Sequence, residues 1–284
     1  MSALDADAGW RVVTGPRAVS GDPKRFVTLT WRIAAMDFKL RFFGSVLGYV
    51  WQLMRPLLMF GVILTVFTIF LPKVSDGVPH YPVVLLLGIV LFTFIGDAIG
   101  PAVSSVVDRE NLVRKIQFPR LVIPASVVLT ACFSLGLNLL VVAIFAAAEG
   151  VSLRPGILEV PIGAAVLIVY VMGLSMLVSA LFVRYRDTRP ITDVFLQAYF
   201  YATPILYPLE SLPQTAQKLL ILLNPFATVL QQLRHAAVAP EVPSAASVVG
   251  GFEWLVIPGV IVAGVCVLGY RVFSRAAPHI AEDL

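Results

Sequence analysis

Residues 81–124 read YPVVLLLGIVLFTFIGDAIGPAVSSVVDRENLVRKIQFPRLVIP. The first twenty residues of this stretch carry a single charged side chain. A helix of about 20 apolar residues is long enough to cross the hydrocarbon core of a bilayer. Six charged residues then fall within 108–120, and the chain becomes apolar again from residue 121. The stretch therefore predicts two membrane spans joined by a short, densely charged loop.

The composition of the whole chain agrees with this interpretation. The 284 residues are 58% hydrophobic and only 13% charged, whereas a soluble domain carries roughly 25% charged residues. Such a chain has too few polar side chains to cover a globular core, so its composition predicts an integral membrane protein. Cys132 and Cys266 both lie in apolar runs, which favours small buried residues over a disulfide framework.

Working outward, the apolar runs predict an all-α fold with six membrane-spanning helices. We place them at 56–71, 81–100, 121–148, 157–183, 191–209 and 254–273. Residues 213–236 interrupt this pattern, because the apolar block LLILL is too short to span and Asn224–Pro225 breaks any helix there. We expect two short helices that dip back into the outer half of the bilayer between spans five and six. An interfacial amphipathic helix lying outside is the alternative.

Lysine and arginine are distributed unevenly between the predicted loops. With a cytoplasmic N-terminus, seventeen of the 21 Lys and Arg residues fall on the cytoplasmic side and only four fall outside. Because positive charge marks cytoplasmic loops, we expect both termini in the cytoplasm. We divide the chain into a cytoplasmic N-terminal segment (1–55), a transmembrane domain (56–275) and a cytoplasmic tail (276–284).

Part of the N-terminal segment, residues 26–43, has the pattern of an amphipathic helix. Apolar and aromatic side chains recur every three or four positions, and the basic side chains lie mostly off that stripe. The stripe consists of Phe26, Leu29, Ile33, Met36, Leu40 and Phe43. This pattern is typical of a helix that lies at the membrane interface.

The charged loop itself predicts a short helix over 109–118. Asp108 is placed to cap its N-terminus, Arg114 and Lys115 lie toward its C-terminus, and Pro119 ends it. An exposed helix of this kind is suited to dock in a groove of a soluble partner. The alternative is that its basic residues are only topology signals.

Motifs for chemistry within the chain are absent from the sequence. There is no GxxxxGK[ST] motif, and His and Cys form no metal-binding cluster, so we expect no ATP site, metal, cofactor or catalytic residue in this chain and no nucleic-acid partner. Four acidic residues, Asp97, Glu159, Asp193 and Glu253, fall near predicted span ends, which disfavours proton or sodium coupling. Any energy source is therefore expected in another polypeptide.

Five segments occur in an order that resembles a known family. They are GSVLGYVWQLMRPLL (44–58), ENLVRKIQFPRLVIP (110–124), RYRD (184–187), ATPILYP (202–208) and LNPF (223–226). Together they resemble the permeases of ABC-2 type polysaccharide exporters, which handle O-antigen, teichoic acid or mycobacterial galactan on lipid carriers. The resemblance covers about residues 26–275.

The resemblance implies the permease subunit of an ATP-binding-cassette exporter for a lipid-linked polysaccharide of the galactan or O-antigen type. It implies a permease homodimer in the bacterial inner (plasma) membrane, with two copies of a cytoplasmic ATPase that bind ATP and Mg. The helix at 26–43 would contact the ATPase, and the two short helices after span five would be external gate helices. A coupling helix in a groove of the ATPase would comprise Asp108, Arg109, Glu110, Asn111, Leu112, Arg114, Lys115 and Phe118.

The resemblance also implies a channel between two permeases, along spans one and five. Aromatic candidates for its wall are Phe195, Tyr199, Phe200, Tyr201 and Tyr207 on span five, and Phe60 and Phe67 on span one. Such rings can contact sugars, although packing and membrane-interface roles are the alternative. Arg41, Arg55 and Arg186 are candidates for attracting the lipid pyrophosphate. Rival functions are an ABC-2 permease for a small hydrophobic drug or lipid, and a membrane-embedded glycan-processing enzyme.

Overall fold

The computed structural model describes residues 23–41, 43, 48, 50–70, 78–111, 118–152 and 154–278, and every regular element among them is helical. Five of the described helical stretches are long and apolar enough to cross a membrane. They are α2 (Val50–Thr65) with the π-turn Val66–Phe70, α3 (Tyr81–Asp108), α5 (Val122–Ala148), α6 (Glu159–Arg184) after a 3-10 turn (Pro155–Leu158), and α11 (Val256–Ala276) after a 3-10 turn (Phe252–Leu255). The all-α class is confirmed.

The predicted fifth span differs from the other five. Its helix, α7 (Thr188–Ala202), has only 15 residues, and the chain then turns through Thr203 and Pro204 to a 3-10 turn at Leu209–Ser211. A helix of 15 residues is shorter than the roughly 20 that span a bilayer. A sixth span therefore stays a prediction.

The third helix of the bundle, α3, lies at its centre. It contacts α2, α5, α6 and α7, and 72% of its most apolar window is buried, against 11% for the stretch Val50–Phe70. The two stretches look alike as apolar runs, yet only α3 is enclosed by this chain. The surface of α2 is left for lipid or for another protein.

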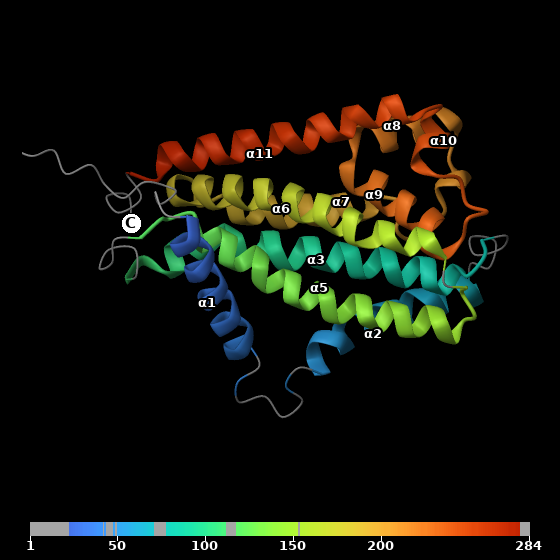
Figure 1. Cartoon of the computed structure of the whole chain (residues 1–284), viewed down its shortest axis with the longest axis horizontal. Coiled ribbons are helices and arrows are strands. Elements are labelled where there is room, and N and C mark those ends of the chain that lie inside the picture. Colours follow the sequence, from blue (N-terminus) through green and yellow to red (C-terminus); the bar gives the residue numbers. More distant parts are fainter. Residues whose placement is uncertain are drawn as a thin grey trace, which may run out of the picture.

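One end of the bundle, here the α1 end, brings together the predicted cytoplasmic segments (Figure 1). The C-terminal ends of α3, α6 and α11 and the start of α5 meet there, and α1 (Pro23–Arg41) lies against α5. Residues of the predicted amphipathic stripe divide in two: the first three, Phe26, Leu29 and Ile33, pack on a buried cluster around Phe273. Met36, Leu40 and Phe43 are exposed. The helix is confirmed, and half of its apolar stripe is left uncovered.

The opposite end, here the α8 end, holds the short helices α8 (Gln214–Leu223), α9 (Pro225–Leu233) and α10 (Ala245–Val249), with a π-turn at Arg234–Val238. The predicted break at Asn224–Pro225 is confirmed: the side chain of Asn224 accepts a hydrogen bond from the backbone N–H of Ala227 at 3.0 Å and so caps α9. Of these helices, α9 contacts both α6 and α11 and lies between their diverging ends (Figure 1).

Candidate functional site

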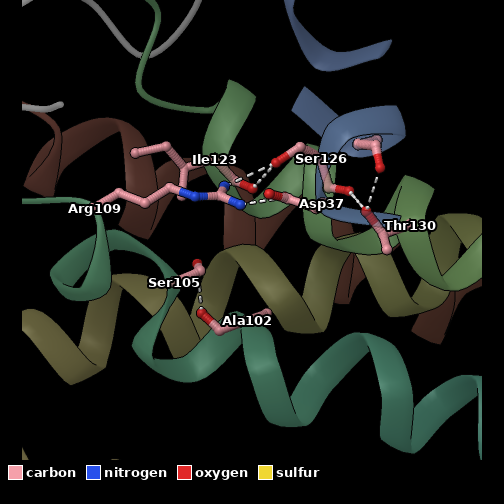
Figure 2. A network of polar contacts seen from close by, with 8 residues as sticks. Asp37, Ala102, Ser105, Arg109, Ile123, Ser126 and Thr130 are labelled. Carbon is pink, nitrogen blue, oxygen red and sulfur yellow. Dashed lines mark hydrogen bonds and ion pairs between the residues drawn. The ribbon is translucent and has the colours of Figure 1, made fainter. Parts of the chain in front are cut away.

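A network of polar contacts fastens α1 to the ends of α3 and α5 (Figure 2). Arg109, the residue after α3, forms an ion pair with Asp37 of α1 and donates a hydrogen bond to Ser126 Oγ of α5 at 3.0 Å. Further along α5, the Thr130 hydroxyl lies 3.3 Å from the carbonyl oxygen of Ala34 on α1. Every one of these contacts joins different elements, so α1 is tied to the segment that leads into the charged loop.

This network borders a small cavity of about 210 Å³. Its lining includes two acidic and two basic side chains, from α1 and from the end of α3: Asp37, Arg41, Asp108 and Arg109. The charges balance, so the cavity favours neither an anion nor a cation.

A second cluster of charged groups forms around Asp97 of α3. Gln52 Nε2 donates to its carboxylate at 3.2 Å, and guanidinium nitrogens of Arg41 and Arg55 lie at 4.0 and 3.8 Å from it. The side chain of Asp97 is 14% exposed, whereas that of Arg55 is 81% exposed. Arg41 and Arg55, two of the pyrophosphate candidates, therefore lie near the same largely enclosed carboxylate. The third, Arg186, lies in the turn after α6, with its guanidinium 5.1 Å from the centre of the Phe182 ring.

The position of Asp97 corrects the sequence interpretation. Because α3 continues to Asp108, eight residues beyond the predicted end at residue 100, Asp97 stands eleven residues from the end of the helix. An ionisable residue inside a span is costly unless it is paired, and it marks function by default. That signal was present in the sequence and was hidden by the early predicted end of the span.

The coupling segment begins differently from the prediction. Asp108 is not a helix N-cap: it is the last residue of α3, and its carboxylate accepts a hydrogen bond from Ser104 Oγ at 2.7 Å. The helix is interrupted at Arg109, and Glu110 and Asn111 are helical again. The candidates Leu112, Arg114 and Lys115 lie outside the described residues.

The remaining coupling candidate, Phe118, is buried. It is 8% exposed and non-helical, and it packs in one cluster with Val106 of α3 and Phe273 of α11. Its ring anchors the end of the charged loop inside the bundle. This corrects its predicted place on an exposed docking helix.

Three of the aromatic channel candidates belong to the core of the subunit. Phe60 and Phe200 are buried, and Phe67 packs against the central cluster. Phe60 meets Phe145 edge to face at 5.5 Å, and Phe200 meets Phe92 in the same way at 4.9 Å. Phe60 and Phe200 therefore support the helices instead of lining an open path, which corrects their assignment to a channel wall.

A fourth candidate, Tyr199, joins α7 to α9. Its hydroxyl donates to Asn224 Oδ1 at 2.6 Å, and the amide nitrogen of Asn224 donates to Thr203 Oγ1 at 2.9 Å. Its ring stacks on Phe195 with the centroids 5.4 Å apart. Every side-chain group of Asn224 is thus used, and the turn after α7 is fixed to the start of α9. The sequence marked Asn224 only as a helix breaker.

The exposed aromatic candidates lie on the outer surface of α7 and beyond it. Phe195 is 45% exposed and Tyr201 is 62% exposed. Tyr207, after the helix, is partly buried, and its hydroxyl donates to the carbonyl oxygen of Tyr201 at 3.4 Å. These three, in contrast to Phe60 and Phe200, are accessible to a molecule passing along α7.

The same helix carries an exposed polar row that the sequence interpretation missed. Arg189, Asp193, Gln197 and Tyr201 follow one another at intervals of four and all are exposed. Side chains four apart lie on one face of an α-helix. The signal was available as a four-residue polar period inside a predicted span.

Apolar helices long enough to span a membrane, packed around a buried central helix, are the architecture of a multi-pass membrane protein. Residues 26–238 match the model of the family described as ABC-2 type transporter. Since the match covers most of the chain, the protein belongs to the ABC-2 type transporter family. The resemblance carried by the five ordered segments is confirmed.

Two proteins of known name show the same relationship. The chain is 27% identical over 210 residues to the O-antigen export system permease protein RfbA of Myxococcus xanthus, a match covering 74% of this chain and 80% of the relative. It is 28% identical over 206 residues to an O-antigen export system permease protein RfbA of Klebsiella pneumoniae, covering 72% and 77%.

Proposed function

We propose that this chain is the membrane permease subunit of an ATP-driven exporter that moves a lipid-linked polysaccharide, of the galactan or O-antigen type, out of the cytoplasm across the bacterial inner membrane. It works as a homodimer with two copies of a separate ATPase, and both termini lie in the cytoplasm. The observation that carries the proposal is the exposed polar and aromatic face of α7, in a family member similar to O-antigen export permeases.

The chemistry of that face fits a sugar chain. Arg189, Asp193 and Gln197 offer hydrogen-bond donors and acceptors, and Tyr201, on the same face, offers a ring on which a sugar face can slide. A polar row facing lipid is costly, so the row needs water or a second subunit opposite it. Two copies of α7 facing one another would enclose a polar path. A small hydrophobic drug would gain nothing from such a row.

The Asp97 cluster is suited to receive the lipid pyrophosphate. Its carboxylate holds Arg41 and Arg55 in one place, at distances of 4.0 and 3.8 Å that are long for direct hydrogen bonds. A pyrophosphate carries more negative charge than one carboxylate and accepts charge-assisted hydrogen bonds from both guanidinium groups. Arg41 and Arg55 would then release the carboxylate of Asp97 and bind the pyrophosphate of the substrate.

The tie between Arg109 and Asp37 gives the ATPase a mechanical route to this cluster. The ATPase would dock on the charged loop after Asp108, and movement of that loop would pull α1 through Asp37. Arg41 is on the last turn of the same helix. ATP binding and hydrolysis in the partner would in this way change how the arginines meet Asp97.

Reconstitution tests the proposed function. The permease and its cognate ATPase are placed in vesicles, and ATP-dependent movement of a lipid-linked glycan is measured. The double variant Gln197→Leu, Tyr201→Leu should reduce transport by at least about tenfold, and Val194→Leu, at an exposed apolar position on the same helix, should not. Turnover of a substrate by the purified permease without any ATPase would show that the exporter function is wrong.

A further inference from the structure

Helices α6 and α11 pack against each other extensively, and glycines permit an especially close approach within this contact. A Cβ atom added at Gly269 of α11 would lie 2.2 Å from the carbonyl oxygen of Gly173 on α6, so the two backbones are in direct contact. Small residues permit such an approach between membrane helices. Toward the α8 end the two helices diverge and α9 lies between them (Figure 1).

Helix α9 only partly fills the space between the diverging helices α6 and α11, and a cleft of about 480 Å³ remains. This volume is within the roughly 300–1,000 Å³ of ligand-binding cavities. Its walls are mainly apolar and come from α6, α9 and α11: Ile162, Val166, Val229, Leu233, Pro258 and Val262. Phe252 and Ile162, which border it, are largely exposed, so the cleft opens to the outside of the bundle.

The place of the cleft decides what can fill it. Both α6 and α11 belong to stretches long and apolar enough to cross a membrane, and Val256 and Val260 of α11 are exposed. An apolar opening between two such helices is suited to contact the hydrocarbon of a bilayer. Water needs two to four polar partners in a cavity, and the polar side chains in this lining, Glu159, Thr228 and Gln232, are few beside its apolar walls. A hydrocarbon chain gains dispersion contacts with the same walls.

The rim of the cleft adds a charge that selects among lipids. Glu159, the first residue of α6, lines it, and its carboxylate accepts a hydrogen bond from Gln232 Nε2 at 2.7 Å. The start of a helix favours a negative charge. A carboxylate there attracts the ammonium group of a zwitterionic headgroup and repels an anionic headgroup.

We propose that this cleft binds one phospholipid, with an acyl chain between α6, α9 and α11 and an ethanolamine headgroup at Glu159. The site lies apart from α7 and from the Asp97 cluster, and it holds whether or not the exported substrate is a polysaccharide. The bound chain completes the packing that α9 leaves open between α6 and α11.

Two glycines of α11 provide a matched test. A Cβ atom at Gly259 or at Gly264 meets nothing within 4 Å, but only Gly259 lines the cleft. Full-length protein is released from nanodiscs of equal phosphatidylethanolamine and phosphatidylglycerol, and retained lipid is counted by native mass spectrometry. Wild type and Gly264→Phe should retain one phosphatidylethanolamine per chain. Gly259→Phe should retain about tenfold less, because the ring occupies the place of several methylenes.

The headgroup is tested by Glu159→Gln, which keeps an acceptor for Gln232 and removes the charge. Its retained lipid should show roughly equal amounts of the two phospholipids. Equal retention by Gly259→Phe and Gly264→Phe would overturn the cleft as the site. Preferential retention of phosphatidylglycerol by wild type would overturn the ethanolamine assignment, and a second permease copy seated in the cleft in place of lipid would overturn the lipid site. If Gly259→Phe does not fold, Gly259→Leu makes the same comparison.

Discussion

The α8 end and the α1 end of the bundle hold their short helices by different forces. At the α8 end, neutral groups of Tyr199, Thr203 and Asn224 meet in a network with every side-chain group of Asn224 satisfied. At the α1 end, charged groups that remain partly exposed hold α1, with Asp37 32% and Arg109 22% exposed. Buried neutral networks resist opening, whereas partly exposed ion pairs rearrange at little cost. Movement is therefore expected at the α1 end.

The largest effect is expected from Asn224→Ala. The change removes the cap of α9 and leaves the Tyr199 hydroxyl without its acceptor, so we expect a loss of about 2–4 kcal/mol in the free energy of unfolding. Denaturant titration of the detergent-solubilised protein, followed by tryptophan fluorescence, measures it. Tyr199→Phe removes the hydroxyl that contacts Asn224 and Tyr170 but keeps the cap of α9, and it should cost about 1–2 kcal/mol. Equal stability of Asn224→Ala and wild type would mean that the α8 end is not held by this network.

The fold was predictable where local chemistry decides. The helix break at Asn224–Pro225 follows from two adjacent residues, and α1 follows from the spacing of its apolar side chains. The end of α3 did not follow, because Gly100–Pro101 looks like a helix stop. The helix continues because Ala102, Val103 and Val106 are buried by packing, which outweighs the local preference.

The candidate site was less predictable, because its partners are distant in sequence. Asp37 and Arg109 are 72 positions apart, and Gln52 and Asp97 are 45 apart. No periodicity links such pairs; only the packing of α1 on α5 and of α2 on α3 does. The burial of Phe60 and Phe200 is equally a result of tertiary packing, since an apolar span looks the same whether it faces lipid or protein.

Asp97→Ala is expected to lower the free energy of unfolding by an intermediate amount. The carboxylate is largely enclosed and accepts a hydrogen bond from Gln52, so its loss should lower the free energy of unfolding by about 1–2 kcal/mol. Asp97→Asn keeps an acceptor for Gln52 and should recover about half of that loss. Identical stabilities of Asp97→Ala, Asp97→Asn and wild type would place this cluster with the loosely held α1 end and remove its structural role.

The smallest effect on stability, and the sharpest on coupling, is expected from Asp37→Asn. Because the pair with Arg109 is partly exposed, its loss should change the free energy of unfolding by only about 0–1 kcal/mol. Under the proposed function, ATP-dependent transport should nevertheless fall, since α1 loses its tie to the loop on which the ATPase docks. Transport in vesicles and binding of the ATPase are measured side by side.

Two further sets of variants distinguish the role of the Asp37–Arg109 ion pair from that of the charged loop on which the ATPase would dock. Exchanging the charges, with Asp37→Arg and Arg109→Asp together, should restore transport that Asp37→Arg alone removes, while ATPase binding stays unchanged throughout. Charge reversal at Arg114 and Lys115 should instead reduce ATPase binding itself. Full transport by Asp37→Arg alone would show that the ATPase does not act through α1. The small contribution of the Asp37–Arg109 pair to the free energy of unfolding would then be unrelated to movement. If charge reversal at Arg114 and Lys115 also left ATPase binding unchanged, these two residues would be topology signals.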